Sequence, residues 1–230
     1  MKNNDNTTPH SAADYDAQIE MTIPYYDAIH HETLDLVKTV KPDAKTWLDT
    51  GCGTGALVEK AYQLFQDTYF ILCDPSENML EESKKRFKGC SSERLCILKP
   101  VPSQELDKNV KSGVDVITAI QSHLYLQKDE RKKATENCYN LLNDHGLYVS
   151  FENIHPLFDD AVGLALDRWT KFQLRAGKNE KDVEEHRKRF NKNYFPIRVQ
   201  EHLNLLKVVG FKIYDLFWYS HMQAGFYAIK

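Results

Sequence analysis

The chain has 230 residues, a formal net charge of -3 at pH 7 and five cysteines, none of them in a C-x-x-C pair. This length allows one substantial hydrophobic core, so we expect one α/β domain with an appended lid rather than two independent domains. The small negative charge gives no general attraction to nucleic acid or to anionic membranes. No stretch reaches the roughly twenty apolar residues of a membrane span, and the polar start lacks the apolar region of a signal peptide. We therefore expect a soluble, cytoplasmic protein.

The N-terminal region combines a polar start with a broken helical pattern. Residues 1–12 are polar, which favours disorder. Residues 13–41 carry apolar side chains at helical intervals that Pro24 interrupts, so we expect two cap helices, the second beginning at Tyr25. The first of them would lie across the mouth of the next motif. Together with the rest of the chain they would form a single domain, residues 13–230.

A glycine-rich turn follows a short apolar run that ends at Trp47 and Leu48. The turn reads Asp49-Thr-Gly-Cys-Gly-Thr-Gly55, and helical spacing begins at Ala56. Alternate glycines allow positive φ angles and let a flat ligand approach the main chain. The G-x-G-x-G spacing differs from the G-x-G-x-x-G of dinucleotide enzymes, and no Gly-Lys-Ser/Thr follows to grip a phosphate. An acid at the mouth of such a turn suits a ligand that carries an ammonium group.

A second strand, Phe70-Ile-Leu-Cys73, ends at Asp74, where a carboxylate can accept both ribose hydroxyls of an adenosine. The two segments Leu48-Asp-Thr-Gly-Cys-Gly-Thr-Gly55 and Cys73-Asp-Pro-Ser-Glu-Asn-Met-Leu80 resemble the first two motifs of class I S-adenosylmethionine (SAM)-dependent methyltransferases. The resemblance covers about residues 15–230. The structural alternative is an ordinary strand, turn and helix followed by an unrelated acid.

The resemblance implies a fold and a cofactor. The fold would be a seven-stranded Rossmann-like sheet, mostly parallel with a C-terminal antiparallel hairpin, with helices on both faces and a helical lid insertion. The cofactor would be SAM, the product S-adenosylhomocysteine (SAH), and no metal would be needed. Asp49 would fix the SAM amino group, Asp74 the ribose, and an N-terminal tyrosine the carboxylate. The expected cofactor-binding residues are Tyr15, Tyr26, Asp49, Gly51, Cys52, Gly53, Gly55, Asp74, Pro75, Met79, Pro102, Ser103, Ile120 and Gln121.

The third strand, Leu95 to Leu98, departs from the family pattern. Related enzymes usually follow it with an acid that takes the adenine amino group, but here Lys99-Pro-Val-Pro-Ser103 stands at that place. Adenine recognition would therefore fall to backbone groups, or to Ser103 and Gln104.

Polar residues follow the next two strands, which are expected at Val114–Ile120 and Leu147–Phe151. Ligands of open α/β sheets bind at the carboxyl ends of the strands. If the acceptor needs a general base, the candidates are His123, Glu152 and His155, and Tyr125 is a candidate substrate contact. Loop residues are polar by default, so these side chains can also be merely solvated.

Residues 156–195 stand outside the strand–helix repeat and predict a helical lid that selects the substrate, with Trp169 and Arg175 as further candidate contacts. From Arg168 to Lys192, nine basic residues stand against four acidic ones. This excess could attract an acidic substrate or RNA backbone. Since the charges interleave and few aromatics accompany them, a solvated helix face is the simpler interpretation.

The tail, a helix at Val199–Val209, Gly210-Phe211 and two strands, resembles the closing hairpin of the methyltransferase sheet. The lid and tail are also distantly similar to tRNA wobble-uridine carboxymethyl-transfer enzymes, which hold the carboxylate of carboxy-SAM with an arginine in that helix. Leu205 occupies the position here, and the helix contains no arginine. This difference favours ordinary SAM.

We therefore expect methyl transfer from SAM, by in-line displacement, to a small-molecule acceptor, in a monomer or homodimer without a membrane partner. Proximity and alignment can supply about 7–11 kcal/mol in the best cases. The alternatives are an RNA-modifying methyltransferase, a non-catalytic SAM-binding protein, and a dehydrogenase with a misinterpreted glycine turn.

Overall fold

The computed structural model describes residue 5 and residues 7–230 and forms a seven-stranded sheet in the order β3-β2-β1-β4-β5-β7-β6. Neighbouring strands run parallel from β3 to β5, and β7 is antiparallel to both β5 and β6. The strands are β1 (Thr46–Thr50), β2 (Tyr69–Cys73), β3 (Leu95–Ile97), β4 (Val114–Ile120), β5 (Leu142–Asn153), β6 (Ile213–Ser220) and β7 (Gln223–Ile229). The predicted Rossmann-like sheet with its antiparallel C-terminal hairpin is confirmed.

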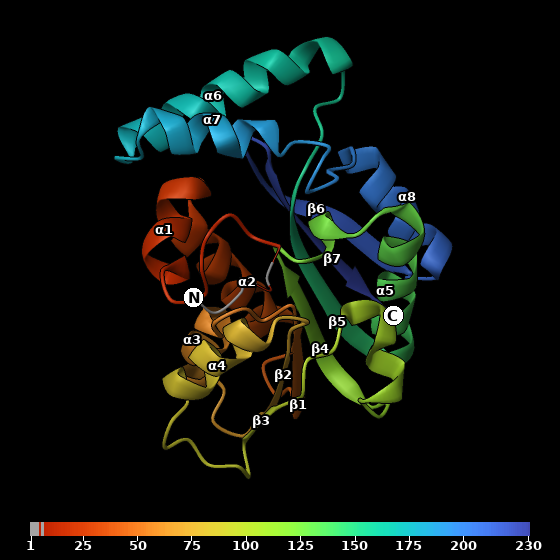
Figure 1. The fold of residues 1–230 in the computed structure, drawn as a ribbon. Helices are drawn as coiled ribbons and strands as arrows, with labels where there is room; N and C mark the ends of the chain where they lie inside the picture. The colour runs from red at the N-terminus through yellow and green to blue at the C-terminus, as the bar shows by residue number, and fades with distance from the viewer. Residues whose placement is uncertain (1–4, 6) are drawn as a thin grey trace.

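Helices cover both faces of this sheet. On one side lie α2, α3 and α4, with α1 above them, and on the other lie α5 and α8 (Figure 1). The α-helices are α1 (Tyr15–Thr22), α2 (Tyr26–Val40), α3 (Ala56–Leu64), α4 (Glu77–Arg86), α5 (Lys128–Leu141), α6 (Val162–Arg175), α7 (Glu180–Lys188) and α8 (Val199–Val209). Short 3-10 helices are η1 (Ser103–Lys108), η2 (His123–Tyr125) and η3 (Asp159–Ala161). No described helix is long and apolar enough to cross a membrane.

Two hydrophobic cores lie on the two faces of the sheet because its central strands are apolar on both sides. On the α2 and α3 side, Trp47 packs edge-on against Phe65 and tilted against Phe70. On the α5 and α8 side, Tyr148 stacks on Phe211, next to the glycine that ends α8. The carboxyl ends of β1, β2 and β4 are thereby fixed side by side at one edge of the sheet.

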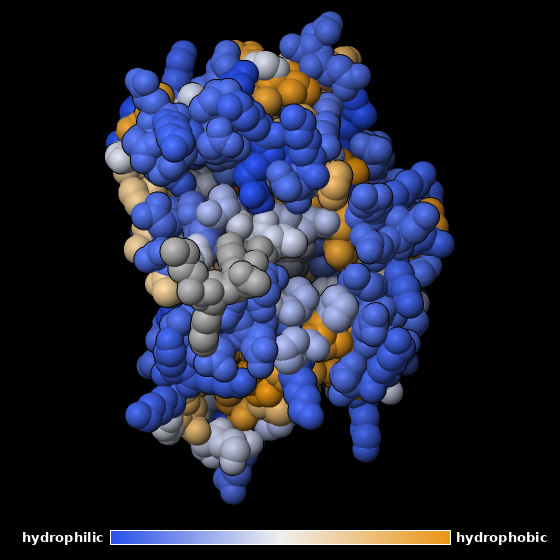
Figure 2. All heavy atoms as spheres, viewed as in Figure 1, coloured by the Kyte–Doolittle hydropathy of each residue, from blue (hydrophilic) through white to orange (hydrophobic). Residues whose placement is uncertain are grey.

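The lid is the pair of helices α6 and α7, which stands above the carboxyl edge of the sheet (Figure 1). The chain leaves and re-enters the body at neighbouring points, because Ile154 and Ile197 form a β-bridge. The buried indole of Trp169 donates to the carbonyl of Thr22 over 2.6 Å and packs against His186. The lid is thus docked on α1, and its outer surface in this view is largely hydrophilic (Figure 2).

The N-terminal segment makes defined contacts. Among the twelve residues expected to be disordered, positions 1–4 and 6 lie outside the described residues. The carboxylate of Asp5 accepts from the Ser76 hydroxyl over 2.6 Å and from the Glu77 amide over 2.8 Å, at the start of α4. Buried His10 bonds to Thr22 over 2.9 Å. This segment therefore runs between α4 and the lid.

Candidate active site

The glycine turn between β1 and α3 uses its three glycines in different ways. All three have positive φ, namely +68° for Gly51, +54° for Gly53 and +83° for Gly55. A Cβ on Gly51 would lie 2.3 Å from the Cβ of Ser122, whereas a Cβ on Gly53 would meet no protein atom within 4 Å. Gly51 is thus needed for packing, and Gly53 faces open space at the mouth of the turn.

Asp49, at the end of β1, is held by a relay of side chains. The Trp47 indole donates to the Thr118 hydroxyl over 3.0 Å, and that hydroxyl donates to the Asp49 carboxylate over 2.6 Å. Burial, the largest cause, together with the nearby charge of Asp74 raises the pKa of Asp49 to about 7. The relay fixes the direction of a carboxylate that burial makes costly to ionise.

Asp74, just beyond β2, lies against the same turn. Its carboxylate accepts from the Gly53 amide over 3.0 Å and from the Ser76 amide over 2.8 Å. Burial raises its pKa to about 6, against these two hydrogen bonds. Among the described residues, neither Asp49 nor Asp74 forms an ion pair. Two buried carboxylates without a cation suit a positively charged ligand.

Helix α1 is fixed above the turn by a cluster of charged side chains. The Thr54 hydroxyl donates to Asp16 over 2.6 Å, and Arg86 donates to the Thr54 carbonyl over 2.8 Å. Arg86 also pairs with Asp16 and with Glu59. These contacts place α1 beside the mouth of the turn.

The tyrosines of the two cap helices meet at the site. Tyr15 and Tyr26 lie close enough for each to influence the pKa of the other. Burial raises the pKa of Tyr15 most, with further contributions from Tyr26, Tyr125 and the charge of Asp74. Both predicted tyrosines therefore lie near the buried carboxylates, Tyr15 near Asp74 and Tyr26 near Asp49, where a phenol hydroxyl can meet a polar ligand group.

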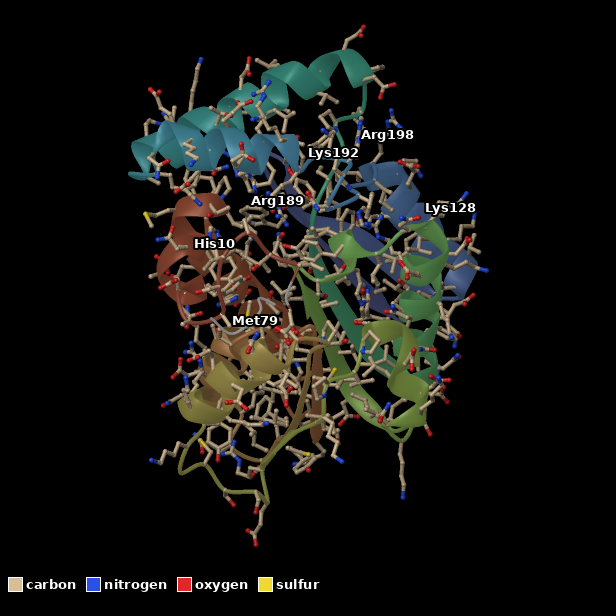
Figure 3. All side chains as sticks on the ribbon, in the orientation of Figure 1. His10, Met79, Lys128, Arg189, Lys192 and Arg198 are labelled. Atoms are coloured by element: carbon tan, nitrogen blue, oxygen red, sulfur yellow. The ribbon has the colours of Figure 1, made fainter. Side chains whose placement is uncertain are left out.

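The remaining residues that were predicted to bind the cofactor differ in burial and in hydrogen bonding. Met79, which is labelled in Figure 3, lies in the first turn of α4 and is buried, whereas Pro75 just before this helix is exposed. Ser103 follows Pro102 at the start of η1, and its hydroxyl shares a 2.7 Å hydrogen bond with Thr50. Cys52 bonds weakly within the turn, over 3.6 Å to the Gly53 carbonyl.

A small enclosed cavity of about 20 Å³, which we term the lid cavity, lies between the carboxyl edge of the sheet and the lid. Gln121, after Ile120 at the end of β4, has a positive φ of 53°, and its amide group donates to Gln223 over 2.7 Å. A strained non-glycine backbone of this kind is common at ligand sites. The cavity lining includes Tyr15, Gln121, Tyr125, Asn153, Arg189 and Tyr194.

Two of the predicted general bases, His123 and Glu152, do not line the lid cavity. Glu152 was expected in a loop beyond the fifth strand, which is wrong, because pairing with Ala224 of β7 extends β5 to Asn153. Strand alternation then turns Glu152 towards α5 and α8. There it lines a cavity of about 10 Å³ together with His123. The lid cavity lining includes neither of these two side chains.

Burial keeps both groups uncharged near neutral pH. The pKa of His123 is lowered to about 3, chiefly by burial and further by Arg131. The pKa of Glu152 is raised to about 8 by burial, against the attraction of Arg131. One oxygen of Glu152 and Nε2 of His123 have no hydrogen-bond partner among the described residues. These groups form a buried polar cluster under the sheet edge.

We expect Glu152→Gln to remove a pH-dependent cost of folding. The folded chain keeps the Glu152 proton up to about pH 8, whereas an unfolded glutamate loses it near 4.3. The folded state therefore binds more protons in this window, and stability falls as pH rises, by at most about 1.4 kcal/mol per pH unit. Urea unfolding at pH 6 and 8.5 should show a smaller loss for the variant than for wild type. Exposed Glu184→Gln is the control, and equal losses for Glu152→Gln and wild type would contradict this expectation.

The other predicted contacts lie at the edges of the lid. His155 bonds to the Pro156 carbonyl over 2.8 Å and packs against Phe190, at the base of the lid. Trp169 is buried in the docking contact with α1. Arg175 is exposed on the last turn of α6. The structure therefore does not bring these three together with the glycine turn.

Sequence reasoning missed Asn153, Arg189 and Tyr194, which line the lid cavity. Asn153 immediately follows the predicted Glu152, and a strand two residues longer would have singled it out by alternation. Arg189 was counted only as one member of a basic run. Nothing in the local pattern distinguishes it from its charged neighbours.

Comparisons with known proteins agree with this geometry. Residues 48–148 match the family model of a methyltransferase domain. A carboxy-S-adenosyl-L-methionine synthase from Nautilia profundicola is 20% identical over 95% of this chain and 92% of its own length. A putative SAM-dependent methyltransferase structure from Methanococcus maripaludis has a TM-score of 0.66 at 17% identity, covering 99% of this chain and 95% of that one. A plantazolicin methyltransferase in complex with SAH has a TM-score of 0.65 at 14% identity, covering 95% and 88%.

The site fits the cofactor that these similarities imply. SAM carries a sulfonium and an ammonium group, and the turn offers two buried carboxylates without a cation beside an open glycine. The sequence motifs, the sheet topology and the matched domain all indicate a SAM-dependent methyltransferase fold. The chain has the fold of class I SAM-dependent methyltransferases, and its residues 48–148 match the family model of a methyltransferase domain.

Proposed function

We propose that this enzyme methylates a small molecule that binds at the lid cavity, which at about 20 Å³ has room for about one water and must widen to take an acceptor. The observation that carries the proposal is the juxtaposition of the lid cavity with the two buried carboxylates. Tyr15 links the two places, because it lines the cavity and the charge of Asp74 contributes to the raised pKa of its hydroxyl. An acceptor in the cavity would therefore lie next to the cofactor.

In methyl transfer, the residues of the chain mainly position the two reactants and exclude water. SAM supplies a methyl group already activated by its sulfonium, so the electron pair of the broken S–C bond stays on sulfur and SAH is released. The described lining of the cavity includes no carboxylate. Its imidazoles are weak bases, since burial lowers the pKa of His10 to about 4 and of His186 to about 3. An acceptor atom that is already electron-rich is favoured, because proton removal would receive little help.

The charge pattern of the lid favours a small molecule over RNA. Several lid cations are paired within the lid, as Arg187 is with Asp167 and Lys188 with Glu185. Such interleaved pairs are typical of a solvated helix surface. The RNA alternative predicts binding of bulk tRNA that weakens steeply with salt, which a filter-binding assay measures.

Production of carboxy-SAM is a second candidate, because relatives named carboxy-SAM synthases align over most of the chain. In this chain α8 contains no arginine, and Leu205 instead lines the small cavity that holds Glu152. A carboxylate on the cofactor would find no guanidinium from α8. This difference favours ordinary SAM.

The test incubates the protein with SAM and a panel of small acceptors and follows SAH release and product mass. A product heavier by one methyl in place of hydrogen, formed together with SAH, supports the proposal. With a carboxylic acid added as a carboxyl donor, a carboxylated cofactor formed without SAH would support the second candidate instead. Binding of SAM without any turnover across the panel, or methylation of tRNA alone, would contradict small-molecule methylation.

We also expect SAM affinity to fall as pH falls. In the ligand-free chain Asp49 has a pKa of about 7 and Asp74 of about 6. A cationic ligand favours their ionised forms, so binding below these values must release protons. Between pH 7.5 and 5.5 the dissociation constant should rise by about tenfold or more. Calorimetry in two buffers of different ionisation enthalpy measures this release, and a flat profile would exclude the two carboxylates as contacts.

A further inference from the structure

Arg189 stands at the boundary between the lid cavity and a wider cleft. It lines both, and the wider cleft has a volume of about 640 Å³ between the N-terminal segment and α7. This volume lies within the roughly 300–1,000 Å³ usual for small-molecule sites. Figure 3 shows Arg189 on the side of the lid that faces the sheet, above His10. A ligand entering from the cleft would pass its guanidinium.

Arg189 has no counter-charge in the described part of the chain. Its Nη2 donates to the carbonyl of Thr7, and no described carboxylate lies within ion-pair distance of it. Arg187, two residues earlier, pairs instead with Asp167 over 2.7 Å, away from the cavity. A guanidinium without a carboxylate partner at a cavity wall retains donors for an anion.

Two further polar atoms of the lid cavity are unsatisfied. The side-chain oxygen of Asn153 and the hydroxyl of Tyr194 are buried and have no hydrogen-bond partner among the described residues. Both residues line the cavity, and Arg189 is the one permanently charged side chain among its described lining residues. Buried polar groups of this kind are normally paired, which points to a polar ligand. The single positive charge favours a monoanion.

We propose that the methyl acceptor is a small organic carboxylate, and that Arg189 binds its carboxylate at the entrance of the lid cavity. The planar guanidinium can donate two parallel hydrogen bonds to a carboxylate. Asn153 and Tyr194 would then contact polar groups at the inner end of the molecule, once the lid cavity of about 20 Å³ has widened to admit it. The inference rests on the proposed function and adds the chemical class of its substrate.

The test compares acids with their neutral amides. SAH-loaded protein is titrated by calorimetry with matched pairs, such as 4-hydroxybenzoate with 4-hydroxybenzamide and 4-aminobenzoate with 4-aminobenzamide. A charged hydrogen bond of about 1.5–3 kcal/mol predicts that at least one acid binds about tenfold or more tightly than its amide. In Arg189→Gln this preference should disappear, while Arg189→Lys should keep part of it. Arg187→Gln is the matched control and should keep it fully.

SAH affinity and melting temperature of each variant separate the outcomes. Loss of acid preference in Arg189→Gln with unchanged SAH affinity supports the inference. It is overturned if no acid of the set is preferred over its amide, or if Arg189→Gln and Arg187→Gln behave alike. Methylation of neutral acceptors as readily as of acids would overturn the inference and leave the proposed function standing. Failure to bind SAM or SAH would overturn both.

Discussion

Replacing Asp74 with alanine is expected to weaken SAM binding by at least about tenfold, the loss expected when a charged hydrogen-bonding group is removed. The carboxylate lies at the end of β2, accepts from the Gly53 amide, and is buried without a cation among the described residues. Removing it takes away a negative charge close to the ligand and one anchor of the turn. Calorimetric titration with SAM measures the change.

Asp74→Asn separates the two contributions. The amide oxygen can still accept from Gly53, so the turn is kept and only the charge is lost. Asp115→Asn is the matched control, because Asp115 likewise accepts from backbone amides, those of Lys45 and Thr46, at the opposite end of β1. The control should lose stability and keep its SAM affinity. Unchanged affinity in Asp74→Ala would refute the assigned role.

Gly51→Ala is expected mainly to lower stability, whereas Gly53→Ala is expected mainly to weaken SAM binding. The added methyl on Gly51 would lie 2.3 Å from the Cβ of Ser122, so the turn or the end of β4 must shift. Overpacking of this kind costs about 1–3 kcal/mol, and the positive φ adds about 1–2 kcal/mol. On Gly53 the strain is similar in kind, but no protein atom lies within 4 Å of the new methyl. That methyl would occupy ligand space instead.

Thermal unfolding and SAM titration together read out this difference. Gly51→Ala should lose the more stability, and Ser122→Gly in the same chain should restore part of it because the clash is removed. Gly53→Ala should lose little more than the strain energy, yet bind SAM about tenfold or more weakly. Normal SAM affinity in Gly53→Ala would mean that the ligand does not approach the turn as proposed.

The strand, glycine turn and helix that contain the predicted cofactor residues are local features of the sequence, which is why this part of the fold could be predicted. Asp49, Gly51, Gly53 and Gly55 lie within seven residues, and the apolar runs on either side specify the strand and the helix around them. Asp74 follows the next strand directly, and parallel pairing brings it to the same edge as Asp49. The physical reason is that strand, turn and helix depend on backbone conformation and on nearby side chains.

The lining of the lid cavity was decided by contacts between distant segments. Pairing of β5 with β7 lengthened β5, turned Glu152 away from the lid cavity and left Asn153 facing it. Docking of Trp169 on α1 placed Arg189 above the sheet edge, 115 residues beyond Asp74. No local pattern encodes such placements, because they depend on which distant surfaces pack together.

On its own, the sequence determined a glycine turn of the SAM-binding type and a sheet with helices on both faces. The spacing of glycines, acids and apolar residues specifies the backbone conformation and the charges of that turn. Which side chains line the lid cavity was decided only by the tertiary structure. Strand register and lid docking choose among many similar polar residues, and that choice depends on packing across the whole chain.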